Sequence, residues 1–173
     1  VTHTICVKCR ARLVVENPTI DTVWVGEIKT AGTVYVAEDG VVDGGEIRTT
    51  HLVLEGVIAS GVVEVYRRLE VRVASSFTPE TINARDLKIA AEVALIYPAL
   101  TFHDVEVVGT LRTDLTATGN VVISERGVLE GNVSCPSLVV RKGGVLRAQV
   151  RVDPSRAASK PPHAGGTQAE QSA

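Results

Sequence analysis

The sequence contains few aromatic residues and no methionine. Of its 173 residues one is Trp, three are Tyr and two are Phe, although 45% are hydrophobic. Valine is the commonest apolar residue, and such β-branched side chains favour strands over helices because they fit a pleated surface. A core of small branched side chains has to be narrow and regular, since nothing large is present to fill irregular gaps. The absence of methionine predicts that further residues precede Val1 in the native protein.

The sequence also lacks a strong charge of one sign and a long hydrophobic run. Its formal net charge is −2, so it has no basic field that would indicate binding to nucleic acid or to an anionic membrane. The longest apolar stretch, residues 87–96, is interrupted by Lys88 and Glu92 and falls short of the ~20 residues that span a bilayer. There is no secretory signal pattern and cysteine is sparse, which predicts a cytoplasmic location. Association with a membrane stays open.

The motifs that bind nucleotides or activate a serine are absent. Neither Gly-x-x-x-x-Gly-Lys-Ser/Thr nor Gly-x-Gly-x-x-Gly occurs, which disfavours a nucleotide-driven polymer, and there is no Gly-x-Ser-x-Gly elbow. His51 and His103 lie beside expected strands, and Asp104 follows His103. Because adjacent strand residues point to opposite faces, this pair is not oriented as a catalytic dyad. We therefore predict a protein that is not an enzyme, with no catalytic residue, no nucleotide cofactor and both histidines on the surface or in turns.

Only three cysteines are present, and Cys6 and Cys9 have the spacing of half a zinc site. Two thiolates two residues apart can hold tetrahedral zinc from a tight turn, but zinc needs four ligands. The sequence has no second pair, and His3 is a candidate for one further ligand. Metal binding by Cys6 and Cys9 stays open beside two alternatives, a redox pair and two ordinary cysteines. We expect Cys135 to be a small residue of a repeat.

Short runs with alternating apolar residues fill the middle of the chain, and glycines separate many of them. Each run places two apolar side chains on one face, as expected for a half-buried strand. The clearest runs are residues 34–36, 52–54, 63–65, 69–73, 87–89, 105–107, 121–123 and 138–140. They recur about every 16–19 residues, which is close to one coil of a three-faced parallel β-helix with roughly six to eight coils. The alternative, an antiparallel β-sandwich, also has short alternating strands.

An internal repeat favours the β-helix. Residues 34–56 align with residues 121–143, so that Gly40 corresponds to Gly127 and Gly44 to Gly131. A register that persists over so many residues indicates a repeat architecture. We expect three sections: an N-terminal stub at residues 1–22, an all-β parallel β-helix at residues 23–152 and a disordered tail at residues 153–173. The tail is rich in Pro, Gly, Ser, Ala and Gln and has too little apolar surface to offset the entropy of ordering.

Residues 107–152 resemble the signature end of the bactofilins, which are also called polymer-forming cytoskeletal proteins. The shared pattern is Gly-x-Leu/Ile-x-x-x-Leu/Val, then a strand, then Gly-x-(Ile/Val/Leu)-x-Gly-x-(Ile/Val), coil by coil. Its positions are occupied by Gly109, Leu111, Leu115, Gly127, Leu129, Gly131, Val133, Leu138, Gly144 and Val150. Residues 23–73 match more loosely, and residues 75–82 resemble an insertion.

This resemblance implies a right-handed β-helix that polymerises end to end without nucleotide and serves bacterial cell shape, polarity or envelope organisation. The partner it implies is the protein itself, with cell-envelope or membrane-associated proteins as further candidates. Some bactofilin-like proteins carry an N-terminal zinc ribbon, and the stretch with Cys6 and Cys9 resembles the second half of one. The physics of the fold agrees with polymerisation, because an uncovered β-helix end can template further strands.

Two other classes of function remain open at this stage. One is a β-helix enzyme, either a hexapeptide-repeat acyltransferase or a carbohydrate-active enzyme. Its left-handed form needs an apolar residue every six positions, and its carbohydrate-binding form needs aromatic stacking residues, neither of which this sequence supplies. The other is an adaptor module that recruits a partner through a metal site at the N-terminal stub.

Overall fold

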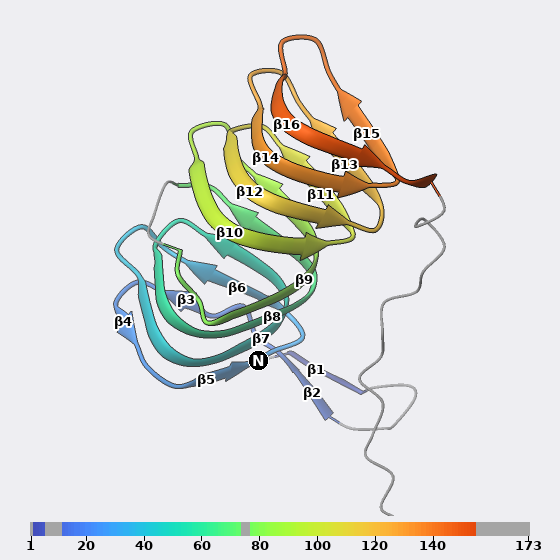
Figure 1. Cartoon of the computed structure of the whole chain (residues 1–173). Helices are drawn as coiled ribbons and strands as arrows, with labels where there is room; N and C mark the ends of the chain where they lie inside the picture. The colour runs from blue at the N-terminus through green and yellow to red at the C-terminus, as the bar shows by residue number, and fades with distance from the viewer. Residues whose placement is uncertain (1, 6–11, 74–76, 155–173) are drawn as a thin grey trace, which may run out of the picture.

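A computed structural model describes residues 2–5, 12–73 and 77–154, and all regular elements in these ranges are β-strands (Figure 1). Strands β1 (Thr2–Ile5) and β2 (Arg12–Val15) form an antiparallel hairpin. All other pairings are parallel, and each joins a strand to its equivalent one coil away. No helix in the described ranges is long and apolar enough to cross a membrane. The predicted all-β parallel β-helix is therefore confirmed.

The remaining strands wind into a right-handed coil. In Figure 1 the chain crosses the near side from left to right, returns on the far side and rises from the N-terminal to the C-terminal end. The strands are β3 (Thr19–Ile20), β4 (Val23–Trp24), β5 (Glu27–Lys29), β6 (Thr33–Val36), β7 (Val41–Leu54), β8 (Val57–Val71), β9 (Thr81–Ile89), β10 (Ala94–Phe102), β11 (Asp104–Val107), β12 (Thr110–Ala117), β13 (Asn120–Ile123), β14 (Val128–Cys135), β15 (Ser137–Val140) and β16 (Val145–Val152). Strand β3 lies inside the stretch predicted as an N-terminal stub.

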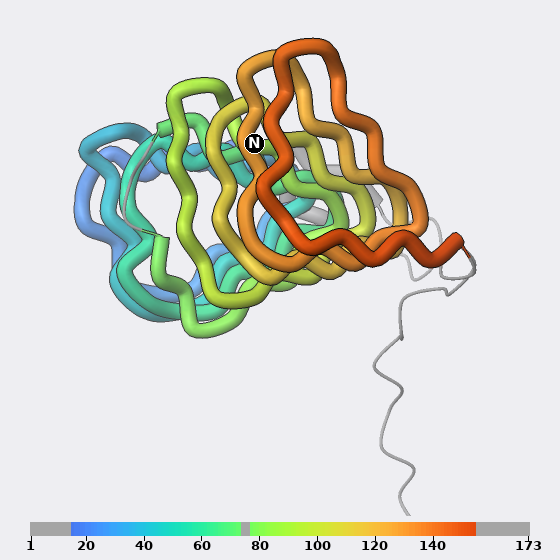
Figure 2. Tube along the Cα trace, turned by 45° about the horizontal axis from the view of Figure 1, so that its top comes forward, coloured from blue at the N-terminus to red at the C-terminus, as the bar shows by residue number. Residues whose placement is uncertain are grey.

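Each coil has three faces, because its strand segments pair in three separate columns. Face 1 comprises residues 19–20, 33–36, 51–54, 68–71, 86–89, 104–107, 120–123 and 137–140. Face 2 comprises residues 23–24, 41–42, 57–58, 94–96, 110–112, 128–130 and 145–147. Face 3 comprises residues 27–29, 46–49, 62–65, 81–84, 99–102, 114–117, 132–135 and 149–152. The stacked coils make a rod whose two ends are its first and last coils (Figure 2).

The core is the column of aliphatic side chains that point inward from each face. On face 1 the inward pair of each coil stacks on the pair of the next coil, which lies 16 to 18 residues further on, as from Val105 to Val121 and from Leu69 to Leu87. In the six coils from Val34 to Ile123 these side chains are at most 2% exposed. Small branched residues suffice because every position has nearly the same neighbours above and below.

Glycines stand where the chain turns from face 1 to face 2. A Cβ on Gly40 would lie 2.2 Å from the carbonyl oxygen of Ile20, and one on Gly127 would lie 2.3 Å from that of Val107. Both amides donate to the residue three positions earlier, at 2.8 and 2.9 Å. Gly40 and Gly127 therefore occupy the same corner of two coils, in agreement with the internal repeat predicted from the sequence.

The ladder is interrupted once, between β9 and β10. Residues 81–84 pair with β8 and β10 pairs with β12, but no pairing joins β9 to β10 on faces 2 and 3 of the described chain. Face 1 continues across this break through the pairing of β9 with β11. We call the break the seam, residues 16–90 the N-terminal half and residues 91–154 the C-terminal half.

Aromatic side chains fill the interior at the seam. Phe77 and Phe102 are both buried, and the rings of Phe77 and Tyr97 lie 6.0 Å apart between centroids. The Tyr97 hydroxyl donates to the carbonyl oxygen of Pro79 at 3.1 Å. Three of the six aromatic residues of the chain thus lie where regular stacking fails.

The expectation of an insertion at residues 75–82 is wrong for the described part of that range. Phe77 bridges to Ile58, and Thr81 and Ile82 pair with Val62 and Val63. The spacing from Leu69 to Leu87 is that of an ordinary coil. The sequence resembled an insertion because residues 75–82 contain neither glycine nor valine.

Candidate assembly surfaces

The C-terminal coil, formed by β15 and β16, exposes side chains that occupy core positions. Val140 follows Ile123 in the inward column of face 1, yet it is 43% exposed where Ile123 is fully buried. Val152 follows Cys135 on face 3 and is 52% exposed, whereas Cys135 is fully buried. The difference arises because no described coil follows the last one. This end of the rod exposes an apolar surface that one further coil would bury.

The same end presents two open strand edges. Strands β15 and β16 are the terminal strands of their sheets, and each pairs with one neighbour, β13 or β14. Their outer backbone N–H and C=O groups have no strand partner within the described ranges. Such an edge accepts a further strand unless proline, charge or a covering element prevents it. Neither strand contains a proline.

The N-terminal coil, formed by β3, β4 and β5, is open on one face only. Trp24 shares the inward column of face 2 with Val42, and it is 42% exposed where Val42 is 2% exposed. Val23 and Val25 beside it are also exposed. Ile20 and Ile28, which point inward from faces 1 and 3, are buried. The opening at this end therefore lies at face 2.

Exposed apolar side chains gather at the two ends rather than along the rod. Among the described residues eleven large apolar side chains are exposed, and eight of them belong to the first or the last coil. Those eight are Val23, Trp24, Val25, Val139, Val140, Val145, Val150 and Val152. Contiguous exposed apolar surface commonly marks a protein interface. The exposed apolar surface of the described residues therefore lies mainly at the two ends.

The sides of the rod are polar. On face 3 of the N-terminal half, Arg48 forms ion pairs with Glu46 at 2.6 Å and with Glu64 at 3.0 Å. The Lys29 ammonium on the same face holds the pKa of the Glu27 carboxyl below its usual range by hydrogen bonding to it. The Glu27 carboxylate is exposed and those of Glu46 and Glu64 are partly exposed, so these pairs keep the surface polar and contribute little to stability.

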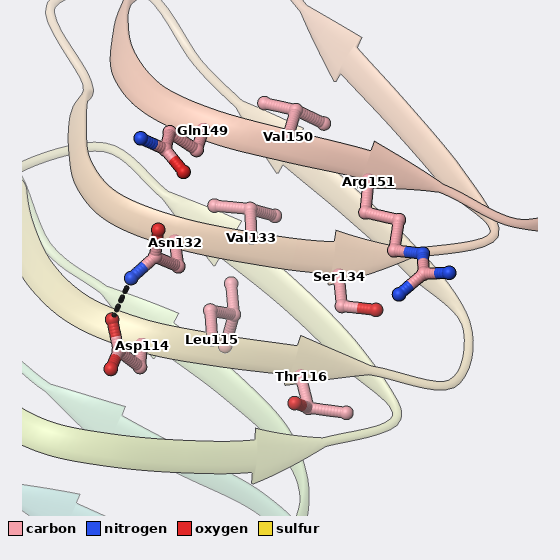
Figure 3. Close-up of a pocket in the computed structure, with 9 residues that line it drawn as sticks. All are labelled: Asp114, Leu115, Thr116, Asn132, Val133, Ser134, Gln149, Val150 and Arg151. Atoms are coloured by element: carbon pink, nitrogen blue, oxygen red, sulfur yellow. Dashed lines mark hydrogen bonds between the residues drawn. The ribbon is translucent and has the colours of Figure 1, made fainter.

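On the C-terminal half, face 3 carries mostly short uncharged side chains around a shallow hollow (Figure 3). The amide of Asn132 donates to the Asp114 carboxylate at 2.8 Å, one coil below. Thr116, Ser134 and Arg151 follow a second outward column. No acid and base converge across this surface in a way that would activate a nucleophile.

The histidines take structural positions. The Nδ1 atom of His103 lies 3.0 Å from the Thr118 hydroxyl oxygen, while Asp104 accepts a hydrogen bond of 2.7 Å from the backbone amide of Asn120. His103 lies in the bend between β10 and β11, Asp104 is the first residue of β11, and their side chains bond to different residues. His51 is half-buried on the outer side of face 1.

Of the three cysteines, Cys135 is the one that lies within the described residues. Cys135 points inward on face 3, and burial raises the pKa of its thiol. It is a small residue of the repeat, as predicted. Cys6 and Cys9 lie outside the described residues, as does the predicted tail from residue 155 onward. No group of three or more His, Cys, Asp or Glu side chains that could hold a metal occurs within the ranges that the structure describes.

Three features of these surfaces were not predicted from the sequence: the seam, the role of Trp24 and the open last coil. The signal for the last coil is present but weak. Val139, Val140, Val150 and Val152 look like the core valines of every other coil, and only their position at the end of the strand pattern distinguishes them. Burial depends on a neighbouring coil, which a local pattern does not specify.

One known family matches the chain. Residues 81–151 match the model of the Bactofilin family, which is described as polymer-forming cytoskeletal. The match begins at the first residue of β9, beside the seam, and ends one residue before the end of β16. No curated protein and no solved structure matches the chain significantly. The match confirms the resemblance predicted from the sequence, and it assigns residues 81–151, from the seam to the last coil, to the bactofilin family.

Proposed function

We propose that this chain is a structural protein that self-assembles end to end into filaments without nucleotide. The observation that carries this proposal is the exposure of core positions at the last coil. A further coil would bury the side chains of Val140, Val150 and Val152 there. The open edges of β15 and β16 support it, because a further coil would satisfy their backbone groups. The description of the matched family as polymer-forming points in the same direction.

In the cell, we place such filaments in the cytoplasm, where they scaffold bacterial cell shape or envelope organisation. The protein itself is the main partner, and proteins of the cell envelope or the membrane are further ones. A rod with polar sides and apolar ends suits a scaffold. It suits a catalyst less well, because no acid, base and nucleophile converge on its surface among the described residues.

The test is assembly of an end variant compared with a side variant. Val140→Glu with Val150→Glu places two charges on the open last coil, whereas Ile96→Glu places one on the side of the rod, where Ile96 is 71% exposed. Negative-stain electron microscopy and sedimentation are recorded across a dilution series without nucleotide. We expect filaments of the unchanged protein and of Ile96→Glu, and a critical concentration at least roughly tenfold higher for the end variant.

Circular dichroism provides the control for folding, because all three altered side chains are exposed and the β-signal should be unchanged. An unchanged protein that stays a monodisperse particle at high concentration would refute the proposal. So would an end variant that assembles as well as the side variant.

A further inference from the structure

Strand β10 has an open edge in the middle of the rod. It is the terminal strand of the sheet β10–β12–β14–β16, and its one strand neighbour in the described chain is β12. The amide of Thr110 donates to the carbonyl oxygen of Val93 at 2.7 Å, and the amide of Thr118 donates to that of Phe102 at 3.0 Å. Since the backbone groups of alternate residues point to opposite sides of a strand, those of four other residues face the seam. These four are Ala94, Ile96, Ala99 and Thr101.

The other border of the seam is open as well. Residues 81–84 of β9 pair with β8 on one side and with no strand of the described chain on the other. The two borders meet through side chains, namely the ring contact of Phe77 with Tyr97 and the hydrogen bond from Tyr97 to Pro79. Strand pairing across the seam is therefore confined to face 1 in the described chain, where β9 pairs with β11.

The side chains of β10 give its edge little protection. Its exposed outward residues are all uncharged, whereas the equivalents of Ile96 in the next three coils all carry charge. Those equivalents are Arg112, Glu130 and Arg147. Natural proteins usually blunt an edge strand with charge, proline or a covering element. Pro98 is the one such residue in β10, and it lies at the register irregularity between Ile96 and Ala99.

We propose that the seam is a binding site for an extended, uncharged segment of another protein, which enters between β9 and β10 and pairs with the open edge of β10. The added strand would bond to the backbone groups that face the seam. It would also place a side chain beside Ile96, which is 71% exposed. The site is independent of end-to-end assembly, because the seam lies away from both ends of the rod (Figure 1).

A single extended segment fits this place better than a folded copy of the protein. Residues 77–84 of the same chain lie on the seam side of β10, so a second rod is blocked from bringing its own β10 to that edge. The C-terminal residues of a second copy are poor candidates, since residues 155–173 contain no Val, Ile, Leu, Phe, Tyr or Trp. Strands favour β-branched and aromatic residues. The occupant is therefore a segment of a different protein, rich in Val, Ile or Thr.

Entry of the segment requires the two halves to separate on faces 2 and 3 while face 1 stays joined through β9 and β11. Among the described contacts it disrupts the ring contact of Phe77 with Tyr97 and the hydrogen bond to Pro79. A row of backbone hydrogen bonds replaces them. Because the segment is ordered only when it binds, its affinity per unit of buried surface is lower than that of a preformed strand.

Binding of a synthetic peptide tests the site. The probe is a fluorescein-labelled peptide of alternating Thr and Val, and a control peptide has proline in place of its central valine. Proline removes one backbone donor and disfavours a strand. Fluorescence anisotropy is recorded with the whole protein. We expect saturable binding of the probe, and binding of the proline peptide that is weaker by roughly tenfold or more.

Charges placed on the edge of β10 identify the contact. One variant carries Ala94→Lys and Ala99→Lys, since lysine on an exposed edge opposes strand addition. The matched control carries Val128→Lys and Asn132→Lys, which occupy the same two columns on β14, a strand that is paired on both sides. We expect the first variant to bind the probe roughly tenfold more weakly, and the control to bind it like the unchanged protein.

Hydrogen exchange resolved by residue gives a second measurement. In the free protein the four amides of β10 that face the seam should exchange faster than those of Leu95 and Leu100, which face β12. A saturating concentration of the probe should slow exchange of the four amides roughly tenfold or more.

Absence of saturable binding by the unchanged protein would overturn the proposal, and so would equal binding of the two peptides or of the two lysine variants. Slow exchange of the four amides in the free protein would show that the edge is closed, which also overturns it. If the lysines on β10 impair filament assembly instead of peptide binding, the occupant is a second copy and the proposal fails. Retained peptide binding by a protein that forms no filaments would refute the proposed function alone.

Discussion

The two halves of the rod build the same three-faced coil in different ways. In the C-terminal half, β10, β12, β14 and β16 are separate strands that pair over faces 2 and 3 with one irregularity, between Ile96 and Ala99. In the N-terminal half, β7 and β8 are strands of 14 and 15 residues that run through all three faces, and their pairing shifts register three times. The match to the bactofilin family covers β9 and most of the regular half.

The two halves also differ in the side chains that they expose. Face 3 of the N-terminal half carries ion pairs that connect successive coils, such as Arg48 with Glu64, whereas the corresponding positions of the C-terminal half are mostly short uncharged side chains. A repeated sequence pattern therefore specifies the coil on one side of the seam, and pairs of side chains from different coils help to specify it on the other. The comparison suggests that the seam divides two units of stability.

Truncation of a core side chain on one side of the seam should cause the largest loss of stability, and that loss should be confined to the same side. Ile47 and Leu115 are both about 1% exposed and point inward from face 3. Each change to Ala should cost about 2–5 kcal/mol because it leaves a cavity. Since stability in stacked repeats is transmitted between neighbours, the break in pairing at the seam should limit its spread.

Hydrogen exchange read by mass spectrometry measures this confinement. Leu115→Ala should speed exchange in residues 94–152 more than in residues 33–71, and Ile47→Ala should do the reverse. Equal loss of protection in both halves would mean that the face 1 ladder alone makes the rod one cooperative unit.

The sequence predicted the repeated parts of this molecule and missed the places where the repeat stops. The inward residues of face 1 and the corner at Gly40 and Gly127 followed from alternation, spacing and internal similarity. The seam did not, because Phe77 and Tyr97 compensate for lost strand pairing through contacts that depend on three-dimensional proximity. The open last coil did not either, since Val140 has the same local pattern as Ile123 and differs only in lacking a described neighbour.

The corner glycines of the N-terminal half should show how tightly its long strands are bent. Gly44 and Gly45 both have positive φ angles, +88° and +79°. A Cβ on Gly45 would lie 1.8 Å from the carbonyl oxygen of Gly26, whereas one on Gly44 would come no closer than 3.9 Å to the Ser60 hydroxyl. Gly45→Ala should therefore lower the free energy of unfolding by about 1–3 kcal/mol more than Gly44→Ala does. Because both positions have positive φ, the difference measures the steric clash apart from the backbone strain.

Urea unfolding of the two variants, followed by circular dichroism, provides the comparison. Equal midpoints would show that the coil can widen at this corner, and the bend would then be less constrained than the close approach to Gly26 indicates.

The pH dependence of stability should show how well the last coil shields the Cys135 thiol from water. Burial raises the pKa of its thiol in the folded protein, so the unfolded chain loses this proton at lower pH. The stability linked to the neutral thiol is fully present below the ordinary thiol pKa of about 8.5, and it is lost as the pH rises through the folded pKa. In a background with Cys6→Ser and Cys9→Ser, stability should fall more steeply above this pH with Cys135 than with Cys135→Ala. Parallel curves for the two proteins would mean that the last coil opens often enough to hydrate the thiol.

The ion pairs of face 3 should give the smallest effect and the one most sensitive to salt. Arg48 contacts carboxylates of its own coil and of the next, and the Glu46 carboxylate raises the pKa of its guanidinium by hydrogen bonding. Arg147 in the C-terminal half contacts one carboxylate, Glu130, at 3.3 Å. Because exposed pairs are weak and screened, Arg48→Gln should lower the Tm only slightly, and 0.5 M NaCl should remove most of the difference. Arg147→Gln is the matched control and should lower the Tm less at low salt. A larger loss for Arg147→Gln would place the more important electrostatic links in the regular half, and the contrast between the two halves would then lie in their backbones alone.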